Sequence, residues 1–195
     1  MKARALILVF VALAAVFLAG AYAWRTTREH EQEQTVAIGG PFQLTDQNGR
    51  AVDESVLKGK WSAVFFGFTY CPDVCPTTLQ ALNAASDQLG GKADDFQIVF
   101  FSVDPKRDTP EQMKAYLDAQ GLRPQTLGLT GTPGQVAAVA KAYRTYYARE
   151  GEGDDYTVTH TNVVYLMNPR GRFDRPLRFD TTPGQIADQI REAMS

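Results

Sequence analysis

Residues 61–76, WSAVFFGFTYCPDVCP, decide the fold. The first nine of them, residues 61–69, form an apolar run rich in aromatic residues, which predicts a strand buried on both faces. Pro76 is tolerated in the first turn of a helix but not in its interior, so a helix is expected to begin there. Apolar residues recur at helical spacing over residues 77–89. The stretch therefore predicts a buried strand, a short loop with two cysteines, and a helix.

The same alternation continues along the chain. Residues 96–103 (FQIVFFSV) predict a second buried strand, and residues 163–167 and 177–179 predict two more, separated by a turn at residues 168–171. The pair Asn48-Gly49 predicts a tight hairpin near the start. Buried strands that alternate with helices imply a central sheet, partly parallel and covered on both faces. The expected fold class is an α/β sandwich with a mixed central sheet.

Three further helices are predicted from their start signals. Thr109, Thr132 and Thr182 are each followed by Pro and, three residues on, by Gln. Threonine can cap the free N–H groups of a first turn, proline is tolerated at the first helical position, and glutamine completes a capping box. The helices are expected to run through residues 113–119, 136–147 and 186–194.

Composition limits the classes of function. A chain of 195 residues fits one ordinary domain with additional segments, and an apolar fraction of 44% is sufficient for a packed core. Lys and Arg number 20 against 22 Asp and Glu, so no basic face for nucleic acid is expected. The sequence contains two cysteines and two histidines, and these are the candidate ligands for a soft metal. One of them, His30, lies in a polar segment and is interpreted as a solvated residue.

The N-terminus predicts a membrane anchor. Residues 5–24 carry no charge, and about 20 apolar helical residues span a hydrocarbon core of about 30 Å. Lys2 and Arg4 precede the run and mark the cytoplasmic side. The expected organisation is an anchor at 1–24, a polar linker at 25–38 and a domain at 39–195. A cleaved signal peptide is the alternative, and either reading exports the domain. The expected location is a bacterial inner membrane, crossed once, with the C-terminal domain in the periplasm.

Cys71 and Cys75 are the strongest candidates for chemistry. They follow a buried strand, and ligands of α/β sheets gather at the carboxyl ends of strands. Cys75 is expected near a helix N-terminus, where the helix dipole favours a thiolate. Two adjacent thiolates suit a soft cation such as Cu(I). A structural disulfide and a purely redox role are the alternatives, although a disulfide that closes so small a loop adds little stability.

Two further residues are expected at the same edge of the sheet. Asp104 ends the second buried strand, where an ordinary turn residue is the alternative interpretation. Asp108 is interpreted as a local capping residue without a functional role.

His160 lies just before the predicted strand 163–167. In a thioredoxin-like sheet the loop entering this strand faces the first strand–helix turn, so the imidazole can complete a copper site of two sulfurs and one nitrogen.

At this point the sequence resembles the Sco/SenC family of copper chaperones for cytochrome c oxidase. The resemblance covers residues 39–195 and rests on FGFTYCPDVCP (66–76), SVDPKRDTP (102–110) and the histidine before residues 163–166. It implies a thioredoxin-like fold, copper ligands at Cys71, Cys75 and His160, and a copper-handling aspartate at Asp104. Relatives often carry an acidic residue just before the histidine where this chain has residues 157–159 (TVT). The sequence therefore does not predict which residue hydrogen-bonds to the His160 ring.

The resemblance implies a membrane-anchored metallochaperone rather than an enzyme. Such a protein binds Cu(I), Cu(II) or both and assists assembly of the CuA centre in cytochrome c oxidase subunit II, or first reduces the cysteines of that centre. Other copper carriers or thiol–disulfide reductants are further expected partners. The alternative is a thiol–disulfide oxidoreductase with a redox-active disulfide between Cys71 and Cys75. A peroxiredoxin is a weaker option, because two closely spaced cysteines, each before proline, do not suit it.

Overall fold

A computed structural model of the chain describes residues 17, 19, 20, 38–153 and 155–195. Residues 38–195 form one folded unit. The predicted anchor at 1–24 and linker at 25–38 lie almost entirely outside the described residues. Within the described part of the chain, no helix is both long and apolar enough to cross a membrane.

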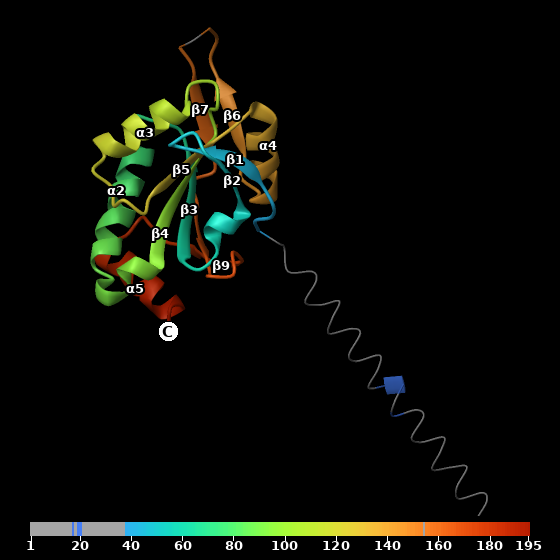
Figure 1. Ribbon diagram of the computed structural model, residues 1–195, viewed down its shortest axis with the longest axis vertical. Coiled ribbons are helices and arrows are strands. Elements are labelled where there is room, and N and C mark those ends of the chain that lie inside the picture. Colours follow the sequence, from blue (N-terminus) through green and yellow to red (C-terminus); the bar gives the residue numbers. More distant parts are fainter. Residues whose placement is uncertain (1–16, 18, 21–37, 154) are drawn as a thin grey trace, which may run out of the picture. The chain divides into compact units, whose positions relative to one another are not determined.

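A seven-stranded mixed sheet forms the centre of the domain (Figure 1). Its strand order is β2-β1-β5-β4-β3-β8-β9, in which β3, β4 and β5 are parallel and the remaining neighbours are antiparallel. The strands are β1 (Gln43–Asp46), β2 (Ala51–Asp53), β3 (Trp61–Gly67), β4 (Phe96–Ser102), β5 (Leu127–Thr130), β8 (Val164–Met167) and β9 (Phe173–Leu177). The predicted partly parallel sheet is therefore confirmed.

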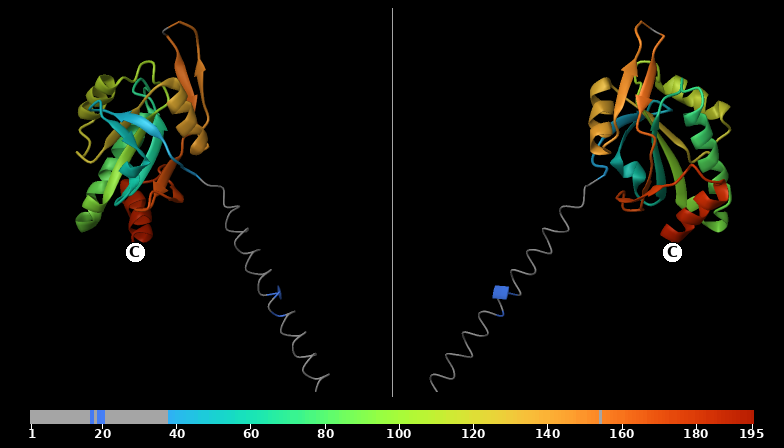
Figure 2. Two further views of the ribbon diagram at one scale, coloured as in Figure 1. Left: turned by 45° about the vertical axis from the view of Figure 1, so that its right-hand side comes forward. Right: turned by 180° about the vertical axis from the view of Figure 1, so that it is seen from behind.

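Helices cover both faces of this sheet (Figures 1 and 2). Helices α2, α3 and α5 pack on one face, and α4 packs on the other. Their bounds are α2 (Val74–Asp87), α3 (Pro110–Ala119), α4 (Pro133–Ala142) and α5 (Pro183–Ala193), with short 3₁₀ turns η1 (Glu54–Leu57) and η2 (Gly90–Asp95).

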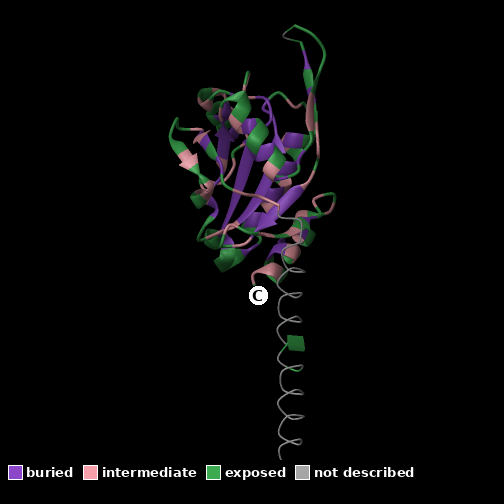
Figure 3. Cartoon of the chain, turned by 90° about the vertical axis from the view of Figure 1, so that its right-hand side faces the viewer, coloured by how far each residue is buried: buried purple, intermediate pink, exposed green. Residues whose placement is uncertain are grey.

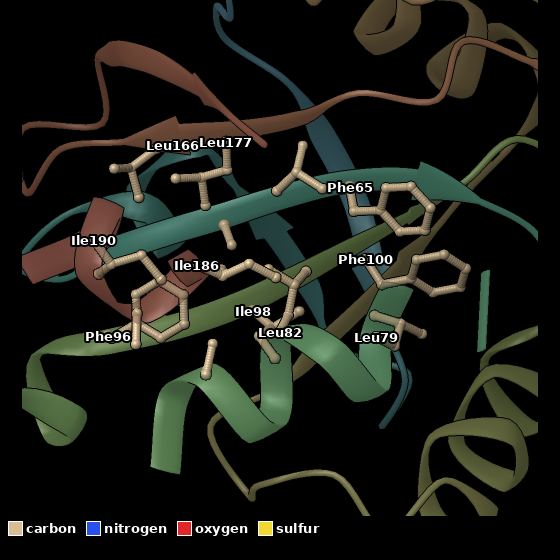
Figure 4. Packing of buried hydrophobic residues seen from close by; sticks show 14 of the residues in the cluster. Phe65, Leu79, Leu82, Phe96, Ile98, Phe100, Leu166, Leu177, Ile186 and Ile190 are labelled. Atoms are coloured by element: carbon tan, nitrogen blue, oxygen red, sulfur yellow. The ribbon is translucent and has the colours of Figure 1, made fainter. Parts of the chain in front are cut away.

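The central strands are buried because side chains of both faces are apolar. Along β3, Ala63 and Phe65 enter the core beneath α2, while Val64 and Phe66 enter the core beneath α4. Figure 4 shows the first of these cores, and Figure 3 shows the sheet as a buried layer. Parallel pairing aligns Gly67 of β3 with Ser102 of β4, so both strands end at one edge. The residues that follow them meet there.

The threonine start signals are confirmed, with one informative departure. Thr132 and Thr182 form complete capping boxes at α4 and α5. Thr109 caps α3 by accepting the N–H of Gln112, but the Gln112 side chain instead donates to Thr69 Oγ1 at 3.1 Å. A residue predicted to complete a local cap thus contacts the segment that leads to the cysteines.

The region after α4 differs most from the prediction. The expected helix at 136–147 ends at Ala142, because Arg144 adopts a left-handed φ of +55°. The chain then forms an unpredicted hairpin of β6 (Tyr147–Glu150) and β7 (Thr157–His160), which projects from the domain (Figure 2). His160 is therefore the last residue of a strand rather than part of a loop.

Two other boundaries also move. Helix α2 begins at Val74, two residues before the predicted start, with Thr77 N–H donating to the carbonyl of Asp73. Pro76 fits inside this first turn because N–H groups there have no helical acceptor. The last strand spans Phe173–Leu177 rather than 177–179, directly after the confirmed turn closed by Gly171 N–H and the carbonyl of Asn168.

Candidate metal centre

The two cysteines are held in a tight connection between β3 and α2. Cys71 N–H donates to the carbonyl of Phe68 at 3.2 Å, which closes a turn before the first cysteine. Cys75 N–H donates to Cys71 Sγ at 3.4 Å, so the first sulfur lies at the N-terminus of α2. Cys71 is half-buried and Cys75 is fully buried, and both are free thiols. The sulfur of Cys71 is therefore the more accessible of the two.

Gly67 allows Cys75 to approach the sheet. A Cβ atom at position 67 would lie 2.6 Å from Cys75 Sγ and 2.7 Å from Phe100 Cε2. Both distances are shorter than a Cβ contact tolerates, and neither neighbour is at the end of a flexible chain. The glycine at the end of β3 is thus a packing requirement of the site.

His160 faces the inner cysteine from the opposite side. Its Nε2 lies 3.7 Å from Cys75 Sγ, and its ring packs edge-on against Phe65 and Phe68 at centroid distances of 6.2 and 6.1 Å. Its Nδ1 lies 3.1 Å from the carbonyl of Thr161, an acceptor that selects the tautomer with a proton on Nδ1. Nε2 then carries a free lone pair directed toward Cys75.

Burial sets the charge state of this pair. It lowers the pKa of His160, so the imidazole is neutral at physiological pH and is able to ligate. Burial also raises the pKa of the Cys75 thiol, against an opposing hydrogen bond from the Phe68 backbone. The expectation that the helix N-terminus would favour a thiolate at Cys75 is therefore wrong for this state of the protein. A bound cation reverses that balance, since a coordinating thiol loses its proton.

The structure brings two of the three predicted ligands into contact and places the third beside them. Cys75 and His160 meet directly, and Cys71 touches the backbone of Cys75. Within the described residues, however, no three His, Cys, Asp or Glu side chains are arranged so that they could hold a metal ion. The donor types fit copper, but the half-buried Cys71 side chain would have to turn toward His160 to close the site.

Residues 30–195 match the SCO1/SenC family. The chain belongs to this family. It is 46% identical over 139 residues to the mitochondrial protein SCO1 homolog 1 of Arabidopsis thaliana, a match that covers 70% of this chain and 41% of that relative. The chain thus spans less than half the length of that relative. The resemblance drawn from the cysteine and aspartate motifs is confirmed.

Solved structures of Sco proteins confirm the thioredoxin-like α/β fold. Bradyrhizobium japonicum ScoI with copper bound matches with a TM-score of 0.74 at 46% identity, over 80% of this chain and 99% of that one. BsSco, described as a member of the Sco family of cytochrome c oxidase assembly proteins with a disulfide switch, matches with a TM-score of 0.66 at 27% identity, over 82% and 93%.

Asp104 of this SCO1/SenC protein lies at the predicted edge and is buried. Its carboxylate accepts the hydroxyl of Tyr156 at 2.6 Å and pairs with Arg107 Nε at 2.5 Å. These hydrogen bonds join the β4–α3 connection to the residue that precedes β7. A role for Asp104 in copper handling stays a prediction.

Asp108 has a larger structural role than the local capping that the sequence predicts for it. It is fully buried, and it accepts hydrogen bonds from Thr69 N–H, from Thr69 Oγ1 at 2.7 Å and from Ser102 Oγ at 2.6 Å. The carboxylate thereby fixes the end of β3 just before the cysteines. An Asp before Thr-Pro also matches a simple cap, so only the three-dimensional contacts distinguish the two roles.

Proposed function

We propose that this protein is a metallochaperone that carries copper as cargo on Cys71, Cys75 and His160. The observation that carries the proposal is the approach of His160 Nε2 to within 3.7 Å of Cys75 Sγ, with the Cys71 sulfur at the adjoining helix N-terminus. A neutral imidazole and two sulfurs suit Cu(I), and Cu(II) gains from the nitrogen donor.

The three proposed ligands differ in how far they are exposed to solvent, and this difference suggests how copper enters and leaves the site. Cys75 and His160 are backed by the rings of Phe65 and Phe68, which exclude water from the inner side. Cys71 is the more exposed sulfur. A copper ion would therefore reach Cys71 first and leave through it, by exchange of one thiolate ligand at a time with the cysteines of a partner.

The proposed partner is the CuA domain of cytochrome c oxidase subunit II, with other copper carriers or thiol reductants as further partners. A Sco protein described as an oxidase assembly factor, together with a copper-bound Sco structure at 46% identity, supports this proposal. We also propose that the uncharged segment at 5–24 anchors the domain at the periplasmic side of a bacterial inner membrane. The support for it is the unbroken uncharged run of residues 5–24, with Lys2 and Arg4 before it and a charged segment after it.

A thiol–disulfide oxidoreductase is the second candidate, because the two free thiols are adjacent and a relative contains a disulfide switch. His160 separates the two proposals. His160 supplies a third donor opposite the two sulfurs, which a three-coordinate copper site needs and which disulfide exchange between two thiols does not require. In both roles the sulfurs act as thiolates, but only the reduction of a partner disulfide leaves Cys71 and Cys75 joined as a disulfide.

Titration of Cu(I) into the reduced and the oxidised protein tests the proposal. We expect the reduced form to bind one copper per chain and the disulfide form to bind none with comparable affinity, since metal needs deprotonated thiolates. The measurement is competition against a chromophoric Cu(I) chelator. Equal affinity in both redox states would refute a thiolate site, and no binding in either state would favour the oxidoreductase.

A further inference from the structure

A stack of aromatic rings and guanidinium groups lies beside the candidate metal centre. The Arg107 guanidinium carbon is 4.7 Å from the Tyr70 ring centroid and 3.7 Å from that of Tyr156. Arg149 also stacks on Tyr156, at 3.8 Å. The order Tyr70, Arg107, Tyr156 follows from these distances, and cation–π contacts of this kind are attractive in partly desolvated positions.

Arg107 is also the polar centre of this stack. Its Nε pairs with Asp104 Oδ2 at 2.5 Å, and its Nη1 donates to the carbonyl of Tyr156 at 3.0 Å. The hydroxyl of Tyr156 donates to the other oxygen of Asp104 at 2.6 Å, which closes a ring of three residues. A planar guanidinium can stack and donate along several directions at once, whereas a lysine ammonium cannot.

The segments that Arg107 joins carry the copper ligands. Tyr70 immediately precedes Cys71, and Tyr156 immediately precedes β7, whose last residue is His160. The Arg107 guanidinium also lies 5.9 Å from the ring of Phe68, which packs edge-on against the His160 ring. One side chain thus contacts both walls of the site without being a ligand.

We propose that Arg107 is the positioning residue that holds the cysteine connection at the correct distance from the hairpin bearing His160. This inference rests on the proposed function, because it concerns the geometry of the same copper site. The Tyr70 side chain is 55% exposed and the hairpin projects from the domain (Figure 2), so the stack on Arg107 adds a direct side-chain link between them to the contact of Phe68 with the His160 ring. Arg107 spans the gap between them.

Arg149 provides a matched control within the same stack. It contacts the ring of Tyr156 as Arg107 does, but it lies within the hairpin, and it donates a hydrogen bond to the Gly153 carbonyl of that hairpin. Loss of Arg149 therefore removes a cation–π contact of similar distance without disconnecting the cysteine side from the histidine side. A general stabilising role for the stack would make the two arginines equivalent.

The experiment compares Arg107→Lys, Arg149→Lys and Tyr70→Leu with the wild type, using the full chain in detergent. Copper affinity is measured by competition for Cu(I) and Cu(II), and the thiolate-to-Cu(II) charge-transfer band is recorded at saturating copper. We expect Arg107→Lys to weaken Cu(II) binding by about 10-fold, the lower end of what loss of a direct partner of a metal ligand causes, because Arg107 acts on the ligands through neighbouring residues, and to shift the band. Arg149→Lys should change neither quantity.

Tyr70→Leu removes the same contact and can be measured even if Arg107→Lys does not fold, because the exposed ring can be removed without opening the core. It should weaken Cu(II) binding in the same direction. The double variant Arg107→Lys/Tyr70→Leu should lose less affinity than the two single losses combined, since both act through one contact.

Outcomes for the inference and for the proposed function are separable. Wild-type affinity and an unshifted band in both Arg107→Lys and Tyr70→Leu would overturn the positioning role while leaving the copper site intact. Equal losses in Arg107→Lys and Arg149→Lys would also overturn it, in favour of general stabilisation. Failure of the wild type to bind copper at all would instead remove the proposed function.

Discussion

At the scale of single residues, burial controls the chemistry of the site more than position in a helix does. Cys75 lies in the first turn of α2, where the helix dipole favours an anion, yet burial raises the pKa of its thiol. The same burial lowers the pKa of His160 and leaves a neutral ligand. The candidate ligands could be chosen from the sequence, because only two cysteines and two histidines occur in it. Their protonation states could not be predicted from the sequence, since these depend on how segments distant in the chain pack around the side chains.

Asp108 allows a test of buried charge. Burial raises the pKa of its carboxyl above the ordinary value of 3.8, so the folded state holds this proton more tightly than the unfolded state does. The stability contributed by Asp108 is then complete below that value and is lost as pH rises through the raised pKa. Asp108→Asn does not ionise, so its stability relative to the wild type should rise between about pH 4 and pH 7. Urea unfolding at both pH values measures this difference.

Asp118→Asn on the exposed side of α3 controls for the loss of a carboxyl group. A relative stability of Asp108→Asn that stays constant over the same pH range would contradict the inferred cost of burying this carboxylate. Asp108→Ala should be the more damaging change at either pH, because three buried donors would lose their acceptor at about 1–3 kcal/mol each.

At the scale of elements, the junction of β3 and α2 depends on one glycine. Gly67→Ala would drive a Cβ into Cys75 Sγ and Phe100, so we expect the free energy of unfolding to fall by about 1–3 kcal/mol, together with a loss of copper affinity. Gly134→Ala in α4 meets no atom within 4 Å and is the matched control. Chemical denaturation and Cu(I) competition measure both effects. A Gly67→Ala protein with wild-type values would show that α2 is free to shift.

The elements that could be predicted from sequence are those with local signals. Continuous apolar runs identified β3 and β4, and three threonine caps identified α3, α4 and α5. The β6–β7 hairpin lacked such a signal, because half of its strand residues are exposed and its pairing is made only in three dimensions. Tyr147 continued the apolar spacing of α4, so the helix was extended past the left-handed Arg144 that ends it. The strand that delivers His160 was therefore missed, although the histidine itself was selected.

At the scale of the whole molecule, parallel pairing of β3 with β4 brings the candidate site together. Their common end places the cysteine connection beside Asp104 and Asp108, and β8 returns the chain on the other side of β3 after His160. A mixed sheet could be predicted from the alternation of strands and helices. The order of the strands in the sheet could not be predicted, since it depends on which strands pair after the chain has folded.

The domain should fold without its N-terminal segment, because the described members of both buried clusters lie within residues 38–194. We expect a chain that begins at residue 34 to give a dispersed amide spectrum and a cooperative thermal transition. Two-dimensional ¹H–¹⁵N NMR measures the dispersion. A collapsed spectrum with the narrow range of a molten state would show that the first 33 residues contribute to the fold.

The X-ray absorption spectrum of copper on the reduced protein shows directly whether His160 is a copper ligand. In the Cu(I) form of the wild type, we expect two sulfur donors and one nitrogen donor, from Cys71, Cys75 and His160. In His160→Ala, which removes a half-buried side chain at the end of β7, the nitrogen should disappear while both sulfurs stay. A wild-type spectrum without nitrogen, or a variant spectrum identical to that of the wild type, would contradict the assignment of His160 as a ligand.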